Sequence, residues 1–374
     1  MSLTAENLES LKLARYELSL RAEDEALLPP FLGSTLRGAL GHSLKAIACS
    51  VPHGDCGRCL LAERCLYPRL FETSARNSFS RNNDSALLRR KQDAPRPFIL
   101  IPPSVVSEHG TLRARDDLLL RRVRVRSGDS IAVGLTLIGE AIDELPYLIY
   151  AISLMARRGL GAGRAPFVLE LVSAVGPNNT RRVVFDNEVD HVIAHAECLT
   201  SLGRLVEMRL VELMRKAIPV SLAQAAETSR PVNAIAADRI PSRVTLRFLS
   251  PTRMRVKGRL EETPTFEQLV VSLSLRLAML AETYATAPVV YDYKGMIELA
   301  REVETVDSSL RLMALDRFSN RQAAKLNLDG FMGDITFAGA ATNDLLPMLV
   351  AGEFLNLGSS TAFGLGRYVV LQVD

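Results

Sequence analysis

The chain has 374 residues, of which 48% are hydrophobic and 23% charged, with 5 cysteines and no tryptophan. This composition excludes a disordered chain, a collagen-like protein and a disulfide scaffold, and it is typical of a globular protein. Two domains are expected, because a single core stops growing at roughly 250–300 residues. The net charge is only +3, so any argument for a polyanionic ligand has to come from clustered charges.

The chain shows no targeting or membrane signal. Its first residues include Glu6 and Glu9 and lack the basic region and apolar core of a signal peptide. The longest apolar run, residues 145–156, is shorter than the roughly 20 residues that a bilayer requires. We therefore expect a soluble cytoplasmic protein with no membrane partner.

The predicted elements occur twice along the chain. In each half a strand is followed by a helix, by further strands, and by a second helix that leads through a glycine loop into a final strand. Pro146 of the first half corresponds to Pro347 of the second, and Gly163 to Gly366. The predicted strands cover residues 16–22, 130–137 and 167–172, then 244–249, 310–315, 333–337 and 368–373, and the first helix of each half covers residues 32–48 and 266–281.

This order is the split βαβ pattern, so we predict an α+β protein with tandem ferredoxin-like (RRM-like) βαββαβ domains. The N-terminal domain covers residues 1–175 and carries a cysteine-rich insertion at about residues 49–72. Residues 176–240 form a helical linker or insertion, with a helix over residues 188–216. The C-terminal domain covers residues 241–374 and contains the second glycine loop.

The two glycine loops are candidate phosphate-binding sites. Each has an arginine just after its last glycine, and exposed backbone amides beside a guanidinium suit a phosphate chain. A glycine loop before a strand is also a common structural feature. A dinucleotide site is excluded, because the loop of that fold opens a helix. The candidate residues are Gly161, Gly163 and Arg164 in the first loop, and Gly364, Gly366 and Arg367 in the second.

Two basic segments alternate with apolar residues. In a strand this alternation places the cations on one face and the apolar side chains on the other. Such runs are usually solvated faces, but the chain has one in each half, and we interpret them as a track for RNA phosphates. Few aromatic residues flank them, so base stacking is not supported. The residues are Arg122, Arg124 and Arg126, and Arg253, Arg255 and Lys257.

Four of the five cysteines, Cys49, Cys56, Cys59 and Cys65, fall within one short stretch. Four thiolates with a C-x2-C pair can close a tetrahedron around Zn²⁺, so we predict a structural zinc site. Reduced core thiols and an iron–sulfur cluster are the alternatives, and His53 can replace one cysteine.

His42 is a candidate general base. It lies in a predicted helix with Gly38 and Gly41, which allow close approach to the backbone, and Lys45 is one turn away. A neutral imidazole can take a proton from a ribose 2′-OH, and an ammonium can stabilise the charged phosphorane. The alternative is a half-buried histidine at a helix–sheet contact.

Five pieces of the sequence together resemble a known family. They are residues 32–45, which contain Arg37, His42 and Lys45, then the cysteine cluster with residues 65–72, the loop 158–164, the stretch 317–322 and the terminal segment 362–368. In this order they resemble the CRISPR-associated endoribonucleases of the RAMP superfamily, which process precursor CRISPR RNA in antiviral defence. The resemblance runs from about Tyr16 to Val373 and is strongest in the cysteine-containing branch.

The resemblance implies tandem ferredoxin-like domains that bind CRISPR repeat RNA and cleave it without a metal, leaving a 2′,3′-cyclic phosphate. It implies that His42 is the general base, helped by Lys45, and Tyr16 on the first strand is a candidate for the hydroxyl that assists. Arg37 and the terminal loop are expected to contact RNA. The alternatives are a non-catalytic RAMP subunit that binds guide RNA in a CRISPR effector complex, and a zinc-containing scaffold with no RNA role.

Overall fold

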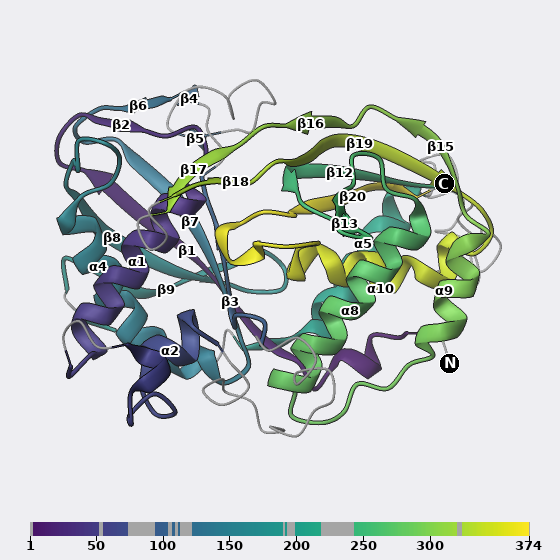
Figure 1. The fold of residues 1–374 in the computed structure, drawn as a ribbon, viewed down its shortest axis with the longest axis horizontal. Coiled ribbons are helices and arrows are strands. Elements are labelled where there is room, and N and C mark those ends of the chain that lie inside the picture. The colour runs from purple at the N-terminus through teal and green to yellow at the C-terminus, as the bar shows by residue number, and fades with distance from the viewer. Residues whose placement is uncertain are drawn as a thin grey trace, which may run out of the picture.

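The computed structural model describes residues 3–51, 55–73, 94–103, 107–108, 111–112, 122–189, 191–192, 199–217, 243–319 and 324–373. Figure 1 shows two lobes side by side, the N-terminal one in purple to teal and the C-terminal one in green to yellow. Each lobe packs helices on one face of a twisted sheet. No helix in the described ranges has both the length and the apolar character needed to cross a membrane.

The N-terminal lobe contains the first strand–helix–strand–strand–helix–strand unit. Its strands in sequence order are β1, β3, β7 and β8, and its sheet has the spatial order β3-β7-β1-β8, continued by β9 and β10. The elements of this lobe are η1 (Glu6–Leu8), β1 (Lys12–Ala22), β2 (Ala26–Leu28), α1 (Gly33–Ala48), η2 (Cys56–Arg58), α2 (Leu66–Phe71), β3 (Phe98–Ile101), β4 (Ser107–Glu108), β5 (Thr111–Leu112), β6 (Val123–Val125), β7 (Ser130–Ile138), η4 (Gly139–Glu144), α4 (Leu145–Arg158), β8 (Phe167–Val175), β9 (Arg181–Asp186), β10 (His191–Val192) and β11 (Thr200–Ser201).

The C-terminal lobe repeats this unit. Its sheet has the order β15-β19-β12-β20, with β16 beside β19, and its strands β12, β15, β19 and β20 follow one another in sequence. The remaining elements are α5 (Leu202–Ala217), β12 (Arg243–Thr252), β13 (Arg255–Val256), β14 (Arg259–Leu260), α8 (Phe266–Tyr284), α9 (Tyr293–Arg301), β15 (Glu304–Ser308), β16 (Arg311–Met313), β17 (Asp316–Ser319), β18 (Ala324–Asn327), β19 (Gly330–Ala338), α10 (Thr342–Leu355), η6 (Thr361–Phe363) and β20 (Tyr368–Val373).

Both sheets place the fourth strand beside the first, then the third, then the second, and all of these pairs are antiparallel. This is the order of the split βαβ fold, so the prediction of tandem ferredoxin-like domains is confirmed. Period-2 burial drives it: along β1 the side chains of Tyr16, Leu18 and Leu20 are buried, whereas Glu17 and Ser19 are half-buried on the other face.

Two predicted elements differ from the structure. Of the strand expected over residues 310–315 only the short β16 is observed, and the second strand of the C-terminal unit, β15, lies before it and ends at Ser308. The helix expected over residues 188–216 begins only at Leu202, because the residues before it pair with strands: His191 with Asp186, and Ser201 with Lys12. Residues 218–240 of the predicted linker lie outside the described residues, and the domain boundaries stay a prediction.

The lobes are joined by close backbone packing between α1 and the segment around η6. A side chain at Gly33 of α1 would lie 1.9 Å from the carbonyl oxygen of Phe363, so only glycine fits there. Within the C-terminal lobe, Arg209 of α5 pairs with Glu353 of α10 at 3.0 Å (Nε to Oε2), with side chains 17% and 8% exposed. The C-terminal glycine loop therefore sits directly against helix α1.

Candidate functional site

Helix α1 presents an open face to solvent. His42 is exposed, and so is Gly38, one turn before it on the same side. A Cβ on Gly38 would meet no atom within 4 Å. Gly41 is different: a Cβ there would lie 3.0 Å from the ring of Phe71, so this glycine serves the packing of α2 on α1. His42 is therefore not the half-buried histidine that the alternative interpretation required.

Lys45 lies one turn beyond His42 but is half-buried. Its ammonium sits over the ring of Tyr67, 5.4 Å from the centroid, a cation–π arrangement. Tyr67 in turn stacks on Phe71 with ring centroids 5.6 Å apart. The structure thus brings His42 and Lys45 to the same part of α1, with Lys45 next to α2.

Tyr16 does not join this site. Its side chain is 2% exposed, on the face of β1 that also carries Leu18 and Leu20. Strand alternation places all three residues in the core beneath the helices. The expectation that Tyr16 supplies a hydroxyl to RNA is therefore wrong.

Arg37 is held between two rings at the junction of the lobes. Its guanidinium carbon lies 4.7 Å from the ring centroid of Phe363 and 5.4 Å from that of Phe71. The side chain also donates to the carbonyl oxygen of Phe71 at 3.5 Å. These contacts join α1, α2 and η6, so the structure gives Arg37 a packing role. The RNA contact expected of it stays a prediction.

The terminal glycine loop does not present bare amides. Gly364 and Gly366 are buried, and their amides donate to the carbonyl oxygens of Thr361 (2.8 Å) and Pro251 (3.0 Å). Arg367 is half-buried, its amide donates to the Ser250 hydroxyl, and burial lowers the pKa of its guanidinium. The expected phosphate cradle is therefore wrong for this loop, which packs the lobes together instead.

The first glycine loop is the accessible one. Gly163 and Arg164 are exposed, and a Cβ on Gly163 would meet nothing within 4 Å. Paired hydrogen bonds between Leu160 and Ala165 close the loop. Gly161 has a φ of 80° and approaches the carbonyl oxygen of Leu27 on β2, which explains why glycine is needed there. The two copies of one motif thus have opposite environments.

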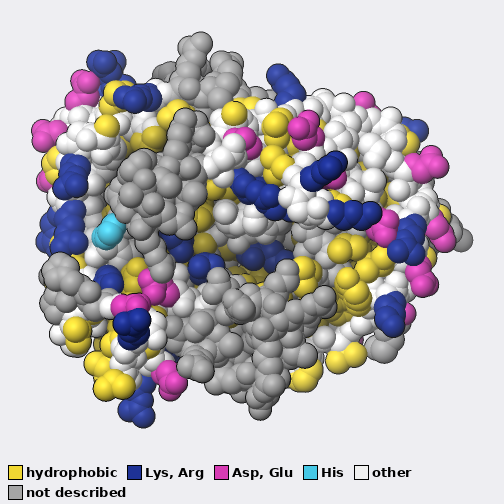
Figure 2. All heavy atoms as spheres, in the orientation of Figure 1, with side chains coloured by type: hydrophobic (Ala, Val, Ile, Leu, Met, Phe, Trp, Pro, Cys, Tyr) yellow, Lys and Arg dark blue, Asp and Glu magenta, His cyan; other side chains and the backbone are white. Residues whose placement is uncertain are grey.

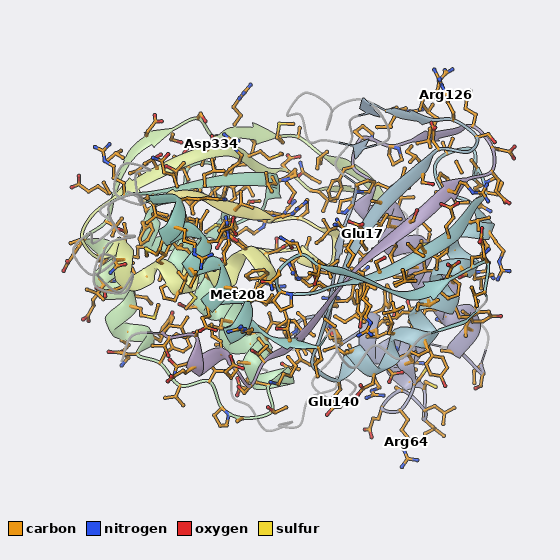
Figure 3. All side chains as sticks on the ribbon, turned by 180° about the vertical axis from the view of Figure 1, so that it is seen from behind. Glu17, Arg64, Arg126, Glu140, Met208 and Asp334 are labelled. Carbon is orange, nitrogen blue, oxygen red and sulfur yellow. The ribbon has the colours of Figure 1, made fainter. Side chains whose placement is uncertain are left out.

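The first basic segment forms the expected strand. Val125 is buried, whereas Arg122, Arg124 and Arg126 are exposed, and Arg126 points away from the edge of the lobe (Figure 3). Arg124 forms an exposed ion pair with Glu25 at 3.3 Å. The predicted separation of cations from apolar side chains is confirmed here.

The second basic segment is a hairpin and not one strand. β13 and β14 are joined by a turn in which Lys257 and Gly258 both have positive φ values, 50° and 84°. Arg255 and Lys257 are exposed, and Arg253 is half-buried and donates to the carbonyl oxygen of Asn327. The turn breaks the expected alternation, so these cations do not share one strand face.

The four clustered cysteines lie between the end of α1 and the start of α2, all half-buried and without disulfides. Burial raises the pKa of the Cys56 thiol, and the Glu72 carboxylate, Cys49 and Cys65 add to the increase. Several thiols are thus within electrostatic reach. Yet in the described parts of the chain no three His, Cys, Asp or Glu side chains are placed to hold a metal ion. His53 lies outside the described residues.

The sequence predictions missed a cluster of arginines between the lobes. Arg96, which precedes β3, and Arg276 on α8 line a cavity together with Arg253 and Arg255. One signal was readable: Arg276 is the only basic residue in the long apolar helix α8. Arg96 gave no signal, because its segment has no periodic pattern.

The fold and the site together define a class: a RAMP-type protein with two ferredoxin-like domains, an exposed histidine on its first helix and basic side chains on both lobes. Two family models match the chain. One, AF_1859_N, is described as an N-terminal domain and matches residues 11–197, half of the chain; the other is described as CRISPR-associated endoribonuclease Cas6 and matches residues 246–368. The first model covers half of the chain and the Cas6 model covers most of the C-terminal lobe, and together they support membership of the family of CRISPR-associated Cas6 endoribonucleases.

Individual relatives are distant. An Archaeoglobus fulgidus protein named "Uncharacterized protein" is 24% identical over 344 residues, which cover 91% of this chain and 92% of the relative. A solved partial Cas6-RT-Cas1–Cas2 complex has a chain with a TM-score of 0.52 and 14% identity, covering 98% of this chain and 47% of that one. The Thermus thermophilus Cas6 has a TM-score of 0.47 and 16% identity, covering 96% and 99%.

Proposed function

We propose that this protein binds CRISPR repeat RNA and cleaves the precursor transcript next to helix α1. The observation that carries the proposal is the open face of α1, where His42 is exposed beside a glycine that leaves the backbone uncovered. A ribose-phosphate strand can approach the imidazole there without displacing any described side chain. Membership of an endoribonuclease family supports the reaction type.

The proposed reaction is a transesterification within the RNA. His42 takes the proton of a ribose 2′-OH, and the 2′ oxygen forms a bond to the adjacent phosphorus. The bond from phosphorus to the 5′ oxygen breaks, and that oxygen takes a proton from the imidazolium. The products are a 2′,3′-cyclic phosphate and a 5′-hydroxyl, so the bonds and protons balance with no metal in the step. Lys45 is near enough along α1 to offset the charge of the phosphorane.

Cationic side chains on both lobes and the first glycine loop are proposed to hold the RNA phosphates. Guanidinium groups bind phosphate oxygens through paired hydrogen bonds, and their positions fix the strand without reading its bases. The residues are Arg122, Arg124 and Arg126, then Gly161, Gly163 and Arg164 of the first loop, and Arg253, Arg255 and Lys257 of the β13–β14 hairpin. Because the net charge is small, affinity should come from these local groups and fall steeply with salt.

The test uses purified protein, its own repeat RNA and EDTA. We expect cleavage of the RNA but not of a copy with a 2′-deoxyribose at the cut site, and mass spectrometry of the product should show the cyclic phosphate. His42→Ala should abolish cleavage while the Kd for RNA stays within about twofold. Ala46→Ser, one turn along the same exposed face, is the matched control. Cleavage by His42→Ala at the normal rate would move the chemistry elsewhere.

One observation favours a second candidate, a subunit that binds guide RNA without cutting it. Because the Tyr16 side chain is in the core, only His42 and Lys45 of the expected catalytic set remain as candidates. The same assay separates the two: tight RNA binding by the wild type with no cleavage of either substrate would leave the binding subunit as the function.

We also propose that the cysteine cluster holds a structural Zn²⁺. The support is the donor chemistry: Cys49, Cys56, Cys59 and Cys65 are all reduced and lie on one lobe between two helices. The thiols would draw closer together on binding. Purified protein should contain one zinc per chain, and Cys56→Ser should lower zinc content and solubility more than cleavage per folded molecule, with Ser50→Ala as a control. An iron-containing, brown preparation would assign an iron–sulfur cluster instead.

A further inference from the structure

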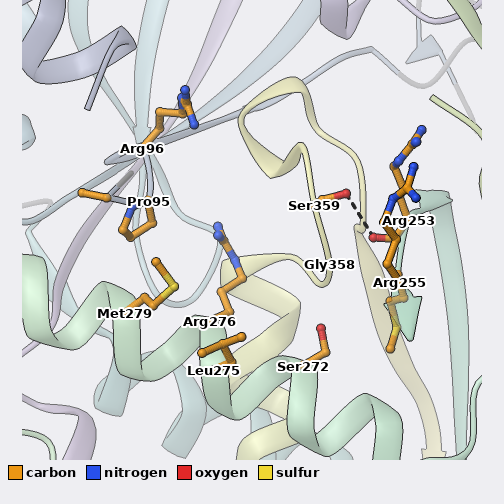
Figure 4. Close-up of a pocket in the computed structure, with 12 residues that line it drawn as sticks. Pro95, Arg96, Arg253, Arg255, Ser272, Leu275, Arg276, Met279, Gly358 and Ser359 are labelled. Atoms are coloured by element: carbon orange, nitrogen blue, oxygen red, sulfur yellow. Dashed lines mark hydrogen bonds between the residues drawn. The ribbon is translucent and has the colours of Figure 1, made fainter. Parts of the chain in front are cut away.

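A cavity of about 330 Å³ lies between the two lobes, at the lower end of the range for small-ligand sites. Arg96 comes from the N-terminal lobe, whereas Arg276 of α8, Ser359 and the start of the β13–β14 hairpin come from the C-terminal one. Figure 4 shows the Arg276 side chain directed from α8 into the space between Arg96 and the loop of Ser359. Figure 2 shows Lys and Arg side chains gathered in the hollow between the lobes.

The lining of this cavity is cationic, and the Asp329 carboxylate, which lies outside the lining, offsets only part of the charge of Arg253. The lining includes the four arginines Arg96, Arg253, Arg255 and Arg276, two serines, and no acidic residue. Unpaired cations that share a partly buried space repel one another, and desolvation adds to their free energy. Such an arrangement lowers the stability of the free protein, and a bound anion would offset that loss.

The hydrogen bonds of the arginines leave donors unused. Arg276 donates from Nε to the carbonyl oxygen of Leu355 at 2.6 Å, the end of α10, which fixes the guanidinium in place. Its Nη2 is buried and has no hydrogen-bond partner among the described residues, and the same holds for Nε of Arg96. A buried donor without an acceptor costs about 1–3 kcal/mol. An anion in the cavity would satisfy both.

Two pKa shifts agree with this picture. Burial lowers the pKa of Arg276 to about 10, although the guanidinium stays charged at neutral pH. Burial also lowers the pKa of Arg253, and the neighbouring Arg255 adds to the decrease, which the Asp329 carboxylate only partly opposes. The charged forms of these groups are therefore held at a higher free energy than in water, which an anion would relieve.

We propose that this cavity is an anion site that receives a phosphate group of the bound RNA strand, at a place apart from His42. Helix α1 contributes none of the lining residues. Phosphate fits the chemistry, because its tetrahedral oxygens accept hydrogen bonds from several guanidiniums that approach from different sides. The serine hydroxyls can donate to the same group. The RNA part of this inference rests on the proposed function; the anion site does not.

The test separates a phosphate of RNA from a free phosphate. The variants are Arg276→Met and Arg96→Gln, and the control is Arg204→Gln, which removes one exposed positive charge from α5. Thermal unfolding is measured with inorganic pyrophosphate and with chloride at equal ionic strength. We expect pyrophosphate to raise the Tm of the wild type and the control but not of either variant. Arg96→Gln decides the outcome if Arg276→Met does not fold.

Fluorescence anisotropy with repeat RNA is the second measurement. Each variant should raise the Kd at least tenfold and make the dependence of log K on log salt shallower, because a phosphate contact is lost. An unchanged Kd and salt slope would overturn the RNA part, and absence of a pyrophosphate effect in the wild type would overturn the anion site. His42→Ala should keep the pyrophosphate effect. If neither the wild type nor any variant cleaves RNA but pyrophosphate still raises the Tm of the wild type, the proposed function is wrong and the anion site is supported.

Discussion

Replacing Gly366 by alanine tests whether the terminal glycine loop packs the lobes or grips a ligand. Gly366 has a φ of 74°, and an alanine Cβ would lie 1.8 Å from the carbonyl oxygen of Leu357. The left-handed conformation costs a non-glycine residue about 1–2 kcal/mol, and overpacking typically adds about 1–3 kcal/mol. The neighbouring backbone cannot simply move, because the amide of Leu357 donates to the carbonyl oxygen of Gly366 at 2.8 Å.

We therefore expect Gly366→Ala to lower the free energy of unfolding by about 3 kcal/mol. The corresponding position of the first loop is the control: a Cβ on Gly163 meets no atom within 4 Å. Gly163→Ala should leave stability unchanged or raise it by about 0.4–1 kcal/mol, because it restricts the unfolded chain.

Urea unfolding followed by far-UV circular dichroism measures both variants, with the midpoint compared at equal slope. RNA affinity is recorded on the folded fraction. The reasoning is refuted if Gly366→Ala stays within 1 kcal/mol of the wild type while its RNA affinity falls, since the loop would then be a phosphate cradle after all.

Two further predictions concern buried or half-buried charges. Glu353→Leu should lower the free energy of unfolding by about 1.5–3 kcal/mol, because the half-buried Arg209 loses its least exposed partner but keeps the ion pair with Glu212 and the hydrogen bond to the carbonyl oxygen of Val370. Adding Arg209→Met should recover most of the loss in the same urea assay, and a double variant as unstable as the single one would contradict this. Burial raises the pKa of Glu144 above its ordinary value of 4.5, more than Arg69 lowers it. Its contribution to stability is then full below the pKa of the unfolded chain and is lost as pH rises through the folded pKa, so the unfolding free energy of the wild type relative to Glu144→Gln should decrease between pH 4 and pH 7. An increase over that interval would show that the Arg69 ion pair dominates.

Much of the site could be read from local sequence, and one error could have been avoided. The exposure of His42 and the alternation of Arg122, Arg124 and Arg126 follow from helix and strand periods, which involve only nearby residues. The same period placed Tyr16 on one face with Leu18 and Leu20, so its burial was readable before its hydroxyl was considered for chemistry. The hairpin turn at Lys257 and Gly258 was also signalled by glycine.

Other features depended on how distant segments meet. Arg209 and Glu353 are 144 residues apart in the chain, and nothing near either one marks the pair. The arginine-lined cavity needs Arg96 from one lobe and Arg276 from the other, so it exists only once the lobes dock. The cysteine spacing indicated a metal ligand set, but spacing does not place the four sulfur atoms in space.

The sequence by itself determined the duplicated ferredoxin-like architecture, because hydrophobic periodicity depends only on nearby residues and the same order of periodic segments occurs in both halves of the chain. Only the tertiary structure decided that one glycine loop is exposed to solvent and the other is buried. Gly163 faces solvent, whereas Gly366 is enclosed by the segments around Pro251 and Leu357 in a loop that packs against helix α1. Whether a loop is buried depends on which distant segments pack against it, and the short glycine motif does not determine those segments.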